Sequence, residues 1–239
     1  MTIKQIPTHP EQYEPEWLNG LFLKGVIAQK ESETRFLNGI IRATKPKKLL
    51  EIGVLHGGSS VVMLNAIKDD SLAYLYSVDI LDTIDFKGKS QKIGWAVQKR
   101  IPELMTQWSL FTGGHTAKFI EKIFAERGEI DLCFLDTAHQ LPGEILDFLL
   151  LLPYMQKSGL IILHDASEDH HYYGDNSLRH GRMYPLTCIS NPVLFAVVRA
   201  DKFKPVEFNR DIFPTANIGA LRLNDDTWKY IDDVFWVKS

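Results

Sequence analysis

The sequence predicts an α/β fold in which a mostly parallel sheet of seven strands carries helices on both faces. Short apolar runs, each typical of a buried parallel strand, alternate along the chain with segments that have apolar residues at helical spacing. A glycine-rich turn also joins the first of these runs directly to a helix. Ligands in folds of this class bind beyond the carboxyl ends of the strands.

The predicted strands follow one another along the chain, with helices between most of them. A helix over residues 31–43, with Phe36, Ile40 and Ile41 at helical spacing, precedes the first strand. The runs predicted as strands are 49–52, 73–78, 108–112, 130–135, 159–163, 193–199 and 217–223. The other predicted helices are 59–67, 116–124 and 141–155. This alternation predicts a Rossmann-like, doubly wound sheet.

Length and composition fit one enzyme-sized domain. The chain has 239 residues, of which 45% are hydrophobic and 24% charged, as expected for a protein with a sizeable core. We expect an N-terminal arm at residues 1–28 and a single domain at 29–239, with a loop insertion around 167–192. The formal net charge of −3 gives no reason to expect a nucleic-acid partner.

No segment predicts export or insertion into a membrane. The N-terminus is too polar for a signal peptide, and the longest apolar run, 148–152, is far too short to span a bilayer. Cys133 and Cys188 form no metal-binding or disulfide pattern. We therefore expect a cytoplasmic protein without a membrane partner, and the sequence leaves open whether it forms a homo-oligomer.

The glycine-rich turn after the first strand predicts a cofactor site. Its glycines are Gly53, Gly57 and Gly58, and Ser59 lies at the start of the next helix. Glycines let a ligand approach the backbone closely, and the start of a helix offers unpaired N–H groups. A dinucleotide site would have the spacing G-x-G-x-x-G, but residue 55 is leucine. The spacing therefore disfavours a nicotinamide dinucleotide.

Polar residues follow the predicted strands where a parallel sheet binds its ligands. Asp79 ends the second strand, and its carboxylate could accept hydrogen bonds from both vicinal hydroxyls of a ribose. The alternative is that Asp79 only caps a turn. The remaining strand-end groups are Glu51, Asp136, His139, His164 and Asp165. Of these, His164 should point away from Asp165 and is expected to be structural.

Three segments together resemble a known enzyme family. Glu51-x-Gly53-x-x-x-Gly57 resembles the first motif of class I S-adenosylmethionine-dependent methyltransferases. The runs 130–139 and 159–165 resemble the O-methyltransferases of the catechol and caffeoyl-CoA type and their bacterial relatives from glycan and antibiotic-sugar pathways. The resemblance extends over about residues 35–165. It implies S-adenosylmethionine (SAM) as cofactor and a small-molecule acceptor such as a sugar, a phenol or another polyhydroxy compound.

The resemblance also implies roles for individual residues. Asp136 and Asp165 match the acids that bind Mg²⁺ in catechol-type enzymes, whereas Ala166 replaces the asparagine that is the third ligand there. His139 stands where that family has a catalytic lysine, so Asp136 and His139 are the predicted catalytic residues. The predicted cofactor-binding residues are Glu51, Gly53, Gly57, Gly58, Ser59, Asp79, His115 and Thr116.

Other interpretations stay open at this point. The chain could be a nicotinamide-dependent oxidoreductase, although its glycine spacing argues against this. It could also be a non-catalytic protein that keeps a methyltransferase-like scaffold. On the acceptor side, His139 and Asp165 could form a hydrogen-bonded pair that fixes two loops without taking part in catalysis.

Overall fold

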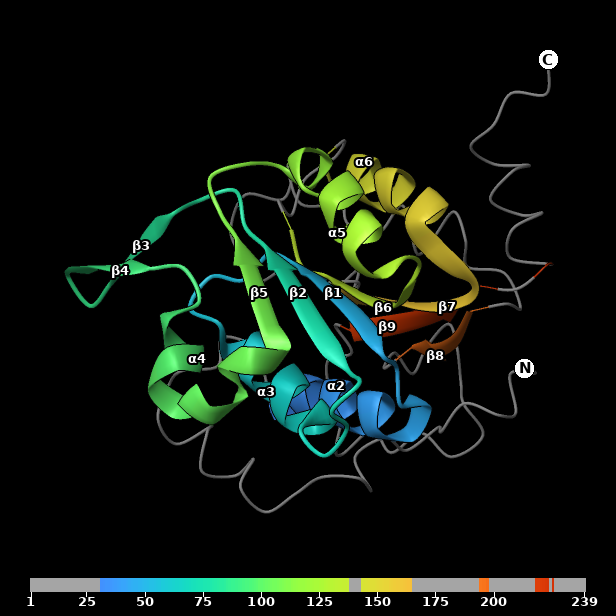
Figure 1. Ribbon diagram of the computed structural model, residues 1–239, viewed down its shortest axis with the longest axis horizontal. Helices are drawn as coiled ribbons and strands as arrows, with labels where there is room; N and C mark the ends of the chain where they lie inside the picture. Colours follow the sequence, from blue (N-terminus) through green and yellow to red (C-terminus); the bar gives the residue numbers. More distant parts are fainter. Residues whose placement is uncertain (1–30, 138–142, 165–193, 198–217, 224, 226–239) are drawn as a thin grey trace. The chain divides into compact units, whose positions relative to one another are not determined.

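The computed structural model describes residues 31–137, 143–164, 194–197, 218–223 and 225, which are coloured in Figure 1. The chain falls into two compact units that divide after Gly128. Several residues of interest lie outside this part of the chain: the arm at 1–28, His139, Asp165, Ala166 and the loop at 167–192. The single domain at 29–239 stays a prediction.

The first unit, up to Gly128, is built on three parallel strands in the order β5–β2–β1. These strands are β1 (Lys48–Ile52), β2 (Tyr74–Val78) and β5 (Trp108–Phe111). Leu49 pairs with Leu75, which pairs in turn with Trp108. Because the strands are parallel, the loops that follow all three begin at the same edge.

Helices cover both faces of these three strands (Figure 1). On one side lie α2 (Glu31–Thr44), α3 (Gly58–Ile67) and α4 (Trp95–Arg100), and on the other lies α5 (Ile120–Arg127). The stripe of Phe36, Ile40 and Ile41 on α2 is at most 2% exposed, which confirms the predicted core face. Two short 3₁₀ helices, η3 (Pro102–Gln107) and η4 (Thr116–Lys118), flank β5.

A hairpin that was not predicted from the sequence separates β2 from α4. It consists of β3 (Thr83–Phe86) and β4 (Lys89–Lys92), which pair antiparallel. Lys87 and Gly88 form its turn with φ angles of 54° and 73°, the left-handed conformations that a two-residue type I′ turn requires. Most of its residues are exposed, so it lacks the apolar run by which a buried strand is recognised.

The second unit contains four strands in the order β6–β7–β9–β8. They are β6 (Ile130–Leu135), β7 (Met155–His164), β8 (Leu194–Val197) and β9 (Ile218–Arg222). β6 and β7 are parallel, whereas β9 is antiparallel to both of its neighbours. Helix α6 (Gly143–Leu151) and the 3₁₀ helix η5 (Leu152–Tyr154) connect β6 to β7. Cys133 is buried on β6.

The helix predicted at 141–155 was too long, and the strand predicted after it was too short. Helix α6 ends at Leu151, and β7 begins at Met155 instead of residue 159. Pro153 explains the difference, because proline has no N–H to donate within a helix and its ring clashes with the preceding turn. The chain therefore passes through η5, with Pro153 near its start, and enters the strand early.

The parallel α/β fold with helices is confirmed, while its seven-stranded, doubly wound form stays a prediction.

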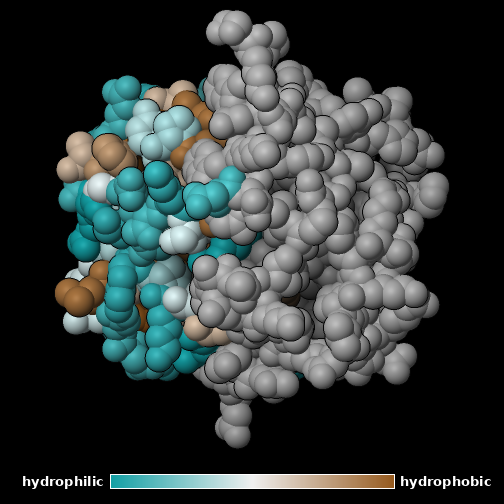
Figure 2. Space-filling view, turned by 90° about the vertical axis from the view of Figure 1, so that its right-hand side faces the viewer, coloured by the Kyte–Doolittle hydropathy of each residue, from teal (hydrophilic) through white to brown (hydrophobic). Residues whose placement is uncertain are grey.

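The described surface visible in Figure 2 is mostly hydrophilic, with small separate hydrophobic areas. Within the described ranges, no helix has both the length and the apolar character needed to cross a bilayer.

Candidate cofactor site

Three loops of the first unit meet at the carboxyl edge of β1, β2 and β5. They are the glycine turn at 53–57, the segment at 79–82 and the loop at 112–116. The amide of Gly53 donates to the carbonyl of Val78 (2.9 Å), and the amide of Asp79 donates to the carbonyl of Phe111 (2.9 Å). The structure therefore places the segments that contain the predicted cofactor residues at one edge.

The glycine turn has a backbone conformation that few residues adopt. The φ angle is positive at Gly53 (89°), Leu55 (53°) and Gly57 (89°). A Cβ atom on Gly57 would lie 2.9 Å from Cα of Gly94, closer than real Cβ contacts allow. Residue 57 is therefore restricted to glycine by both its conformation and the space around it.

Helix α3 begins at this turn with an open N-terminus. Its N-cap is Gly57, and no side chain caps the helix. The amide of Val61 donates to the carbonyl of Gly57 (3.0 Å), so the preceding amides of Gly58, Ser59 and Ser60 have no partner within the helix. Since α3 has 10 residues, its dipole adds to these donors. The arrangement favours an anionic group such as a carboxylate.

Glu51 is completely buried beneath the turn and binds three serine hydroxyls. Its carboxylate accepts hydrogen bonds from Ser59 Oγ (2.5 Å), Ser60 Oγ (2.5 Å) and Ser77 Oγ (2.6 Å). Ser77 Oγ also accepts a hydrogen bond from Trp108 Nε1 (2.8 Å). This network ties the start of α3 to all three strands. The hydroxyl of Ser59 is thus directed at Glu51, and contacts of either residue with a cofactor stay predictions.

Asp79 supports the turn from the neighbouring strand. Its Oδ2 accepts hydrogen bonds from the amides of Val54 (2.9 Å) and Leu55 (3.0 Å), and its Oδ1 accepts one from the amide of Leu81 (2.9 Å). A carboxylate has about four acceptor directions, so about one remains, on Oδ1. One ribose hydroxyl could bind there, whereas both vicinal hydroxyls would require a backbone amide to move away.

The loop after β5 presents one of its two predicted residues to solvent. His115 is exposed and precedes η4, whereas Thr116 is only 2% exposed. Thr112 Oγ1 donates to Oδ1 of Asp82 (2.6 Å), which links this loop to the segment after β2. The imidazole of His115 is therefore accessible to a ligand, while Thr116 contributes mainly to packing.

Exposed apolar side chains gather in two of these loops. Leu55 is 39% exposed, Ile80 53% and Leu81 50%. Exposed apolar side chains that cluster beside polar groups often mark a place that a ligand covers. An aromatic or other flat, partly apolar group would suit this surface.

His56, Phe86 and Trp95 were not among the predicted site residues. Their rings lie beside the glycine turn, with centroids 4.7 Å apart for His56 and Phe86, and 6.2 Å for His56 and Trp95. Burial lowers the pKa of His56, which favours the neutral form of its imidazole. No apolar run in the sequence pointed to this cluster, because Phe86 belongs to the unpredicted hairpin.

In the second unit, two polar groups lie at the ends of β6 and β7. Asp136 follows β6, as predicted, and His164 ends β7. His164 Nδ1 lies 3.3 Å from Oδ1 of Asp136, and the residue is 8% exposed. His164 was expected to be only structural, but this contact makes it a partner of a predicted catalytic residue. Among the described residues, no three His, Cys, Asp or Glu side chains gather as a metal site.

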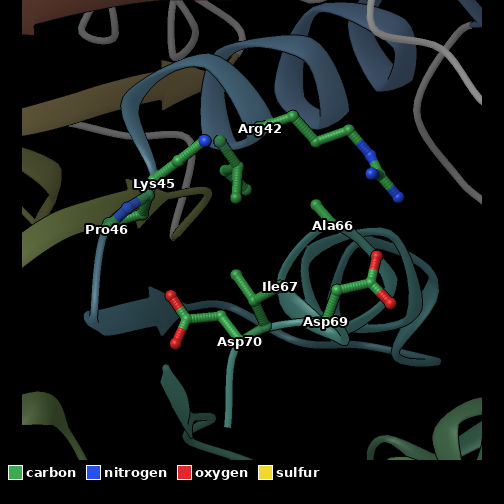
Figure 3. Close-up of a pocket in the computed structure, with 8 residues that line it drawn as sticks. Arg42, Lys45, Pro46, Ala66, Ile67, Asp69 and Asp70 are labelled. Atoms are coloured by element: carbon green, nitrogen blue, oxygen red, sulfur yellow. The ribbon is translucent and has the colours of Figure 1, made fainter. Parts of the chain in front are cut away.

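A surface pocket of about 360 Å³ lies away from this edge (Figure 3). Arg42 and Lys45, from the end of α2, stand across it from Asp69 and Asp70, which follow α3. A hydrogen bond from Lys47 lowers the pKa of Asp70. Because β1 and β2 begin beside this pocket and end at the glycine turn, the pocket is separate from the candidate cofactor site.

Comparison with known proteins identifies a matching domain that includes these segments. A family model described as a methyltransferase domain matches residues 50–166. This range includes the glycine turn, Asp79, the loop at 112–116 and Asp136. No curated protein matches the chain.

Solved structures share the fold at low sequence identity. The O-methyltransferase from Bacillus cereus in complex with SAH is 16% identical, with a TM-score of 0.57, covering 92% of this chain and 100% of that one. TomG from Streptomyces achromogenes, an O-methyltransferase in complex with SAM, is 13% identical, with a TM-score of 0.56, covering 88% and 91%. Cofactor-bound Rv0187 from MTB is 13% identical, with a TM-score of 0.59, covering 88% and 90%. At these identities the likeness shows the fold.

Proposed function

We propose that the chain, whose residues 50–166 match a methyltransferase domain, is a class I SAM-dependent methyltransferase that methylates a hydroxyl of a small molecule. One observation carries the proposal. Three loops and the open N-terminus of α3 meet at one edge of a single compact unit, in a domain that matches methyltransferases. The matched fold and this geometry give no support to a nicotinamide-dependent oxidoreductase.

The cofactor would lie along this edge from α3 to the loop at 112–116. Its methionine carboxylate would accept hydrogen bonds from the amides at the start of α3, where the helix dipole favours a negative charge. One ribose hydroxyl would donate to the remaining acceptor site of Asp79 Oδ1. The adenine would lie near Ile80, Leu81 and His115, where apolar surface is exposed next to a polar ring.

On the acceptor side we propose Asp136 and His139 as catalytic residues. The imidazole of His139 would take the proton of the acceptor hydroxyl while its oxygen attacks the methyl carbon of SAM; the C–S bond breaks and S-adenosylhomocysteine (SAH) leaves. Asp136 and Asp165 would hold Mg²⁺, which prefers carboxylate oxygens and lowers the pKa of a bound hydroxyl. Of these two acids the structure describes Asp136, whose carboxylate is 16% exposed and lies 3.3 Å from Nδ1 of His164.

The proposal also covers the acceptor, the location and the complete sheet. We propose sugars, phenols and other polyhydroxy compounds as the acceptor classes, and the cytoplasm as the location of the enzyme. The seven strands would form one doubly wound sheet, and the question whether the protein forms a homo-oligomer stays open.

We expect wild-type protein to transfer label from methyl-labelled SAM to a hydroxyl acceptor, with catechol and methyl rhamnoside as probes. The His139→Ala variant should react roughly a hundredfold more slowly, as is typical when a general base is lost. Its SAH affinity should be unchanged, because His139 serves the acceptor.

Chelation should abolish methyl transfer, and added Mg²⁺ should restore it. Full activity after thorough chelation would contradict metal assistance, and an unchanged rate in His139→Ala would exclude His139 as the base.

A further inference from the structure

The unpredicted β3–β4 hairpin connects two loops of the candidate cofactor site. At its base, Asp82 accepts hydrogen bonds from Thr112 Oγ1 (2.6 Å) and, through its carbonyl, from the amide of Ile93 (3.1 Å). Next to its turn, Phe86 packs edge-on against His56, with ring centroids 4.7 Å apart and planes at 68°. The hairpin therefore contacts the loop at 112–116 and the glycine turn at 53–57.

The glycine turn needs support from its surroundings. Leu55 has a φ angle of 53°, a conformation that is unfavourable for a residue with a side chain. Asp79 holds the amides of Val54 and Leu55. The carbonyls of Leu55 and His56 accept hydrogen bonds from the amides of Gly94 (2.9 Å) and Ala96 (3.0 Å). The backbone is thus fixed on both sides, and the side chain of His56 is fixed through its ring.

Phe86 connects His56 to the start of α4. Its ring lies 5.3 Å from that of Trp95, which in turn is 6.2 Å from His56. The indole Nε1 of Trp95 is buried without a hydrogen-bond partner. Ring packing therefore holds this side chain in place, without help from a hydrogen bond of the indole. Removing the Phe86 ring would therefore loosen both neighbours.

We propose that Phe86 is a positioning residue for the cofactor: its ring holds His56 and so keeps the glycine turn in the conformation that binds SAM. The inference rests on the proposed function, since it assumes that this turn binds the cofactor. Without the ring, the turn would reach its binding conformation only part of the time. The apparent dissociation constant rises in inverse proportion to that fraction.

The test is a calorimetric titration of the whole chain with SAH. We expect Phe86→Ala to raise the Kd for SAH about tenfold, and Phe86→Leu to raise it less because part of the packing remains. The matched control is Lys89→Ala, which changes the exposed residue paired with Phe86 across the hairpin and should leave the Kd unchanged. In a double-mutant cycle, the effects of Phe86→Ala and His56→Ala on the Kd for SAH should be less than additive, because both changes remove the contact between these two rings.

Amide hydrogen exchange without SAH separates positioning from a general loss of stability. In Phe86→Ala, the amides of Val54 and Leu55 should exchange faster, while those of Leu49 and Leu50 in β1 should not change. Faster exchange throughout β1 would make Phe86 merely structural and overturn the inference. So would an SAH affinity within twofold of wild type, or additive effects in the cycle. If wild-type protein fails to bind SAH, the proposed function fails with it; if only Phe86→Ala is unaffected, this inference alone fails.

Discussion

Gly57→Ala should lower the free energy of unfolding by about 2–5 kcal/mol. An alanine at a φ angle of 89° carries a left-handed backbone, which costs about 1–2 kcal/mol. Its Cβ would also lie 2.9 Å from Cα and 3.1 Å from the carbonyl oxygen of Gly94. These are backbone atoms at the start of α4 and cannot rotate away, and such overpacking costs about 1–3 kcal/mol more.

The matched control for this change is Gly88→Ala in the hairpin turn. Gly88 also has a positive φ angle, 73°, but a Cβ atom there would meet nothing within 4 Å. Only the conformational cost should appear, about 1–2 kcal/mol. Urea unfolding followed by circular dichroism measures both variants. Equal losses would show that the close approach of Gly57 to Gly94 contributes nothing.

Glu51→Ala should destabilise the chain by at least about 3 kcal/mol. The change leaves three buried hydroxyls, those of Ser59, Ser60 and Ser77, without their acceptor, and an unsatisfied buried group costs about 1–3 kcal/mol. It also leaves a cavity beneath the glycine turn. SAH binding should weaken as well, because the start of α3 loses its connection to β1.

Glu51→Gln and Glu129→Ala are the comparisons for this variant. Glutamine keeps the size and one acceptor oxygen, so its loss should be smaller than that of alanine. Glu129 is exposed, and its removal should change the unfolding free energy by less than about 0.5 kcal/mol. A loss below about 1 kcal/mol in Glu51→Ala would contradict the role given to the serine network.

The buried strands were predictable because burial on both faces requires continuous apolar sequence. β6 (Ile130–Leu135) has the predicted bounds, and β1 and β2 differ from prediction by one residue. The β3–β4 hairpin was missed because its strands are short and mostly exposed, and its turn places Lys87 where asparagine or aspartate is the usual signal. The end of α6 was predicted wrongly because the apolar pattern continues beyond Leu151, and the effect of Pro153 was underestimated.

The sequence predicted which strand ends form the site better than it predicted the contacts between their side chains. Parallel strands bring Gly53, Asp79 and His115 to one edge whatever their side chains do. Two amides of the glycine turn donate hydrogen bonds to Asp79, and these bonds depend on a backbone conformation that sequence patterns do not predict. Phe86 contacts His56 because the hairpin lies against the glycine turn. The two residues are 30 positions apart in the sequence, and local periodicity does not report contacts over such a separation.

The most direct test of the central claim is calorimetric titration of wild-type protein and Asp79→Ala with SAM, SAH and NAD. We predict that wild-type protein binds SAM and SAH but not NAD. Asp79→Ala should weaken SAH binding by about 1.5–3 kcal/mol, because the change removes a charged acceptor from both the ribose and the glycine turn. Asp69→Ala, at the pocket of Figure 3, should bind SAH as wild type does. Two results would contradict a SAM site at the glycine turn. One is that the protein binds NAD in place of SAH. The other is that Asp69→Ala lowers the affinity for SAH while Asp79→Ala leaves it unchanged.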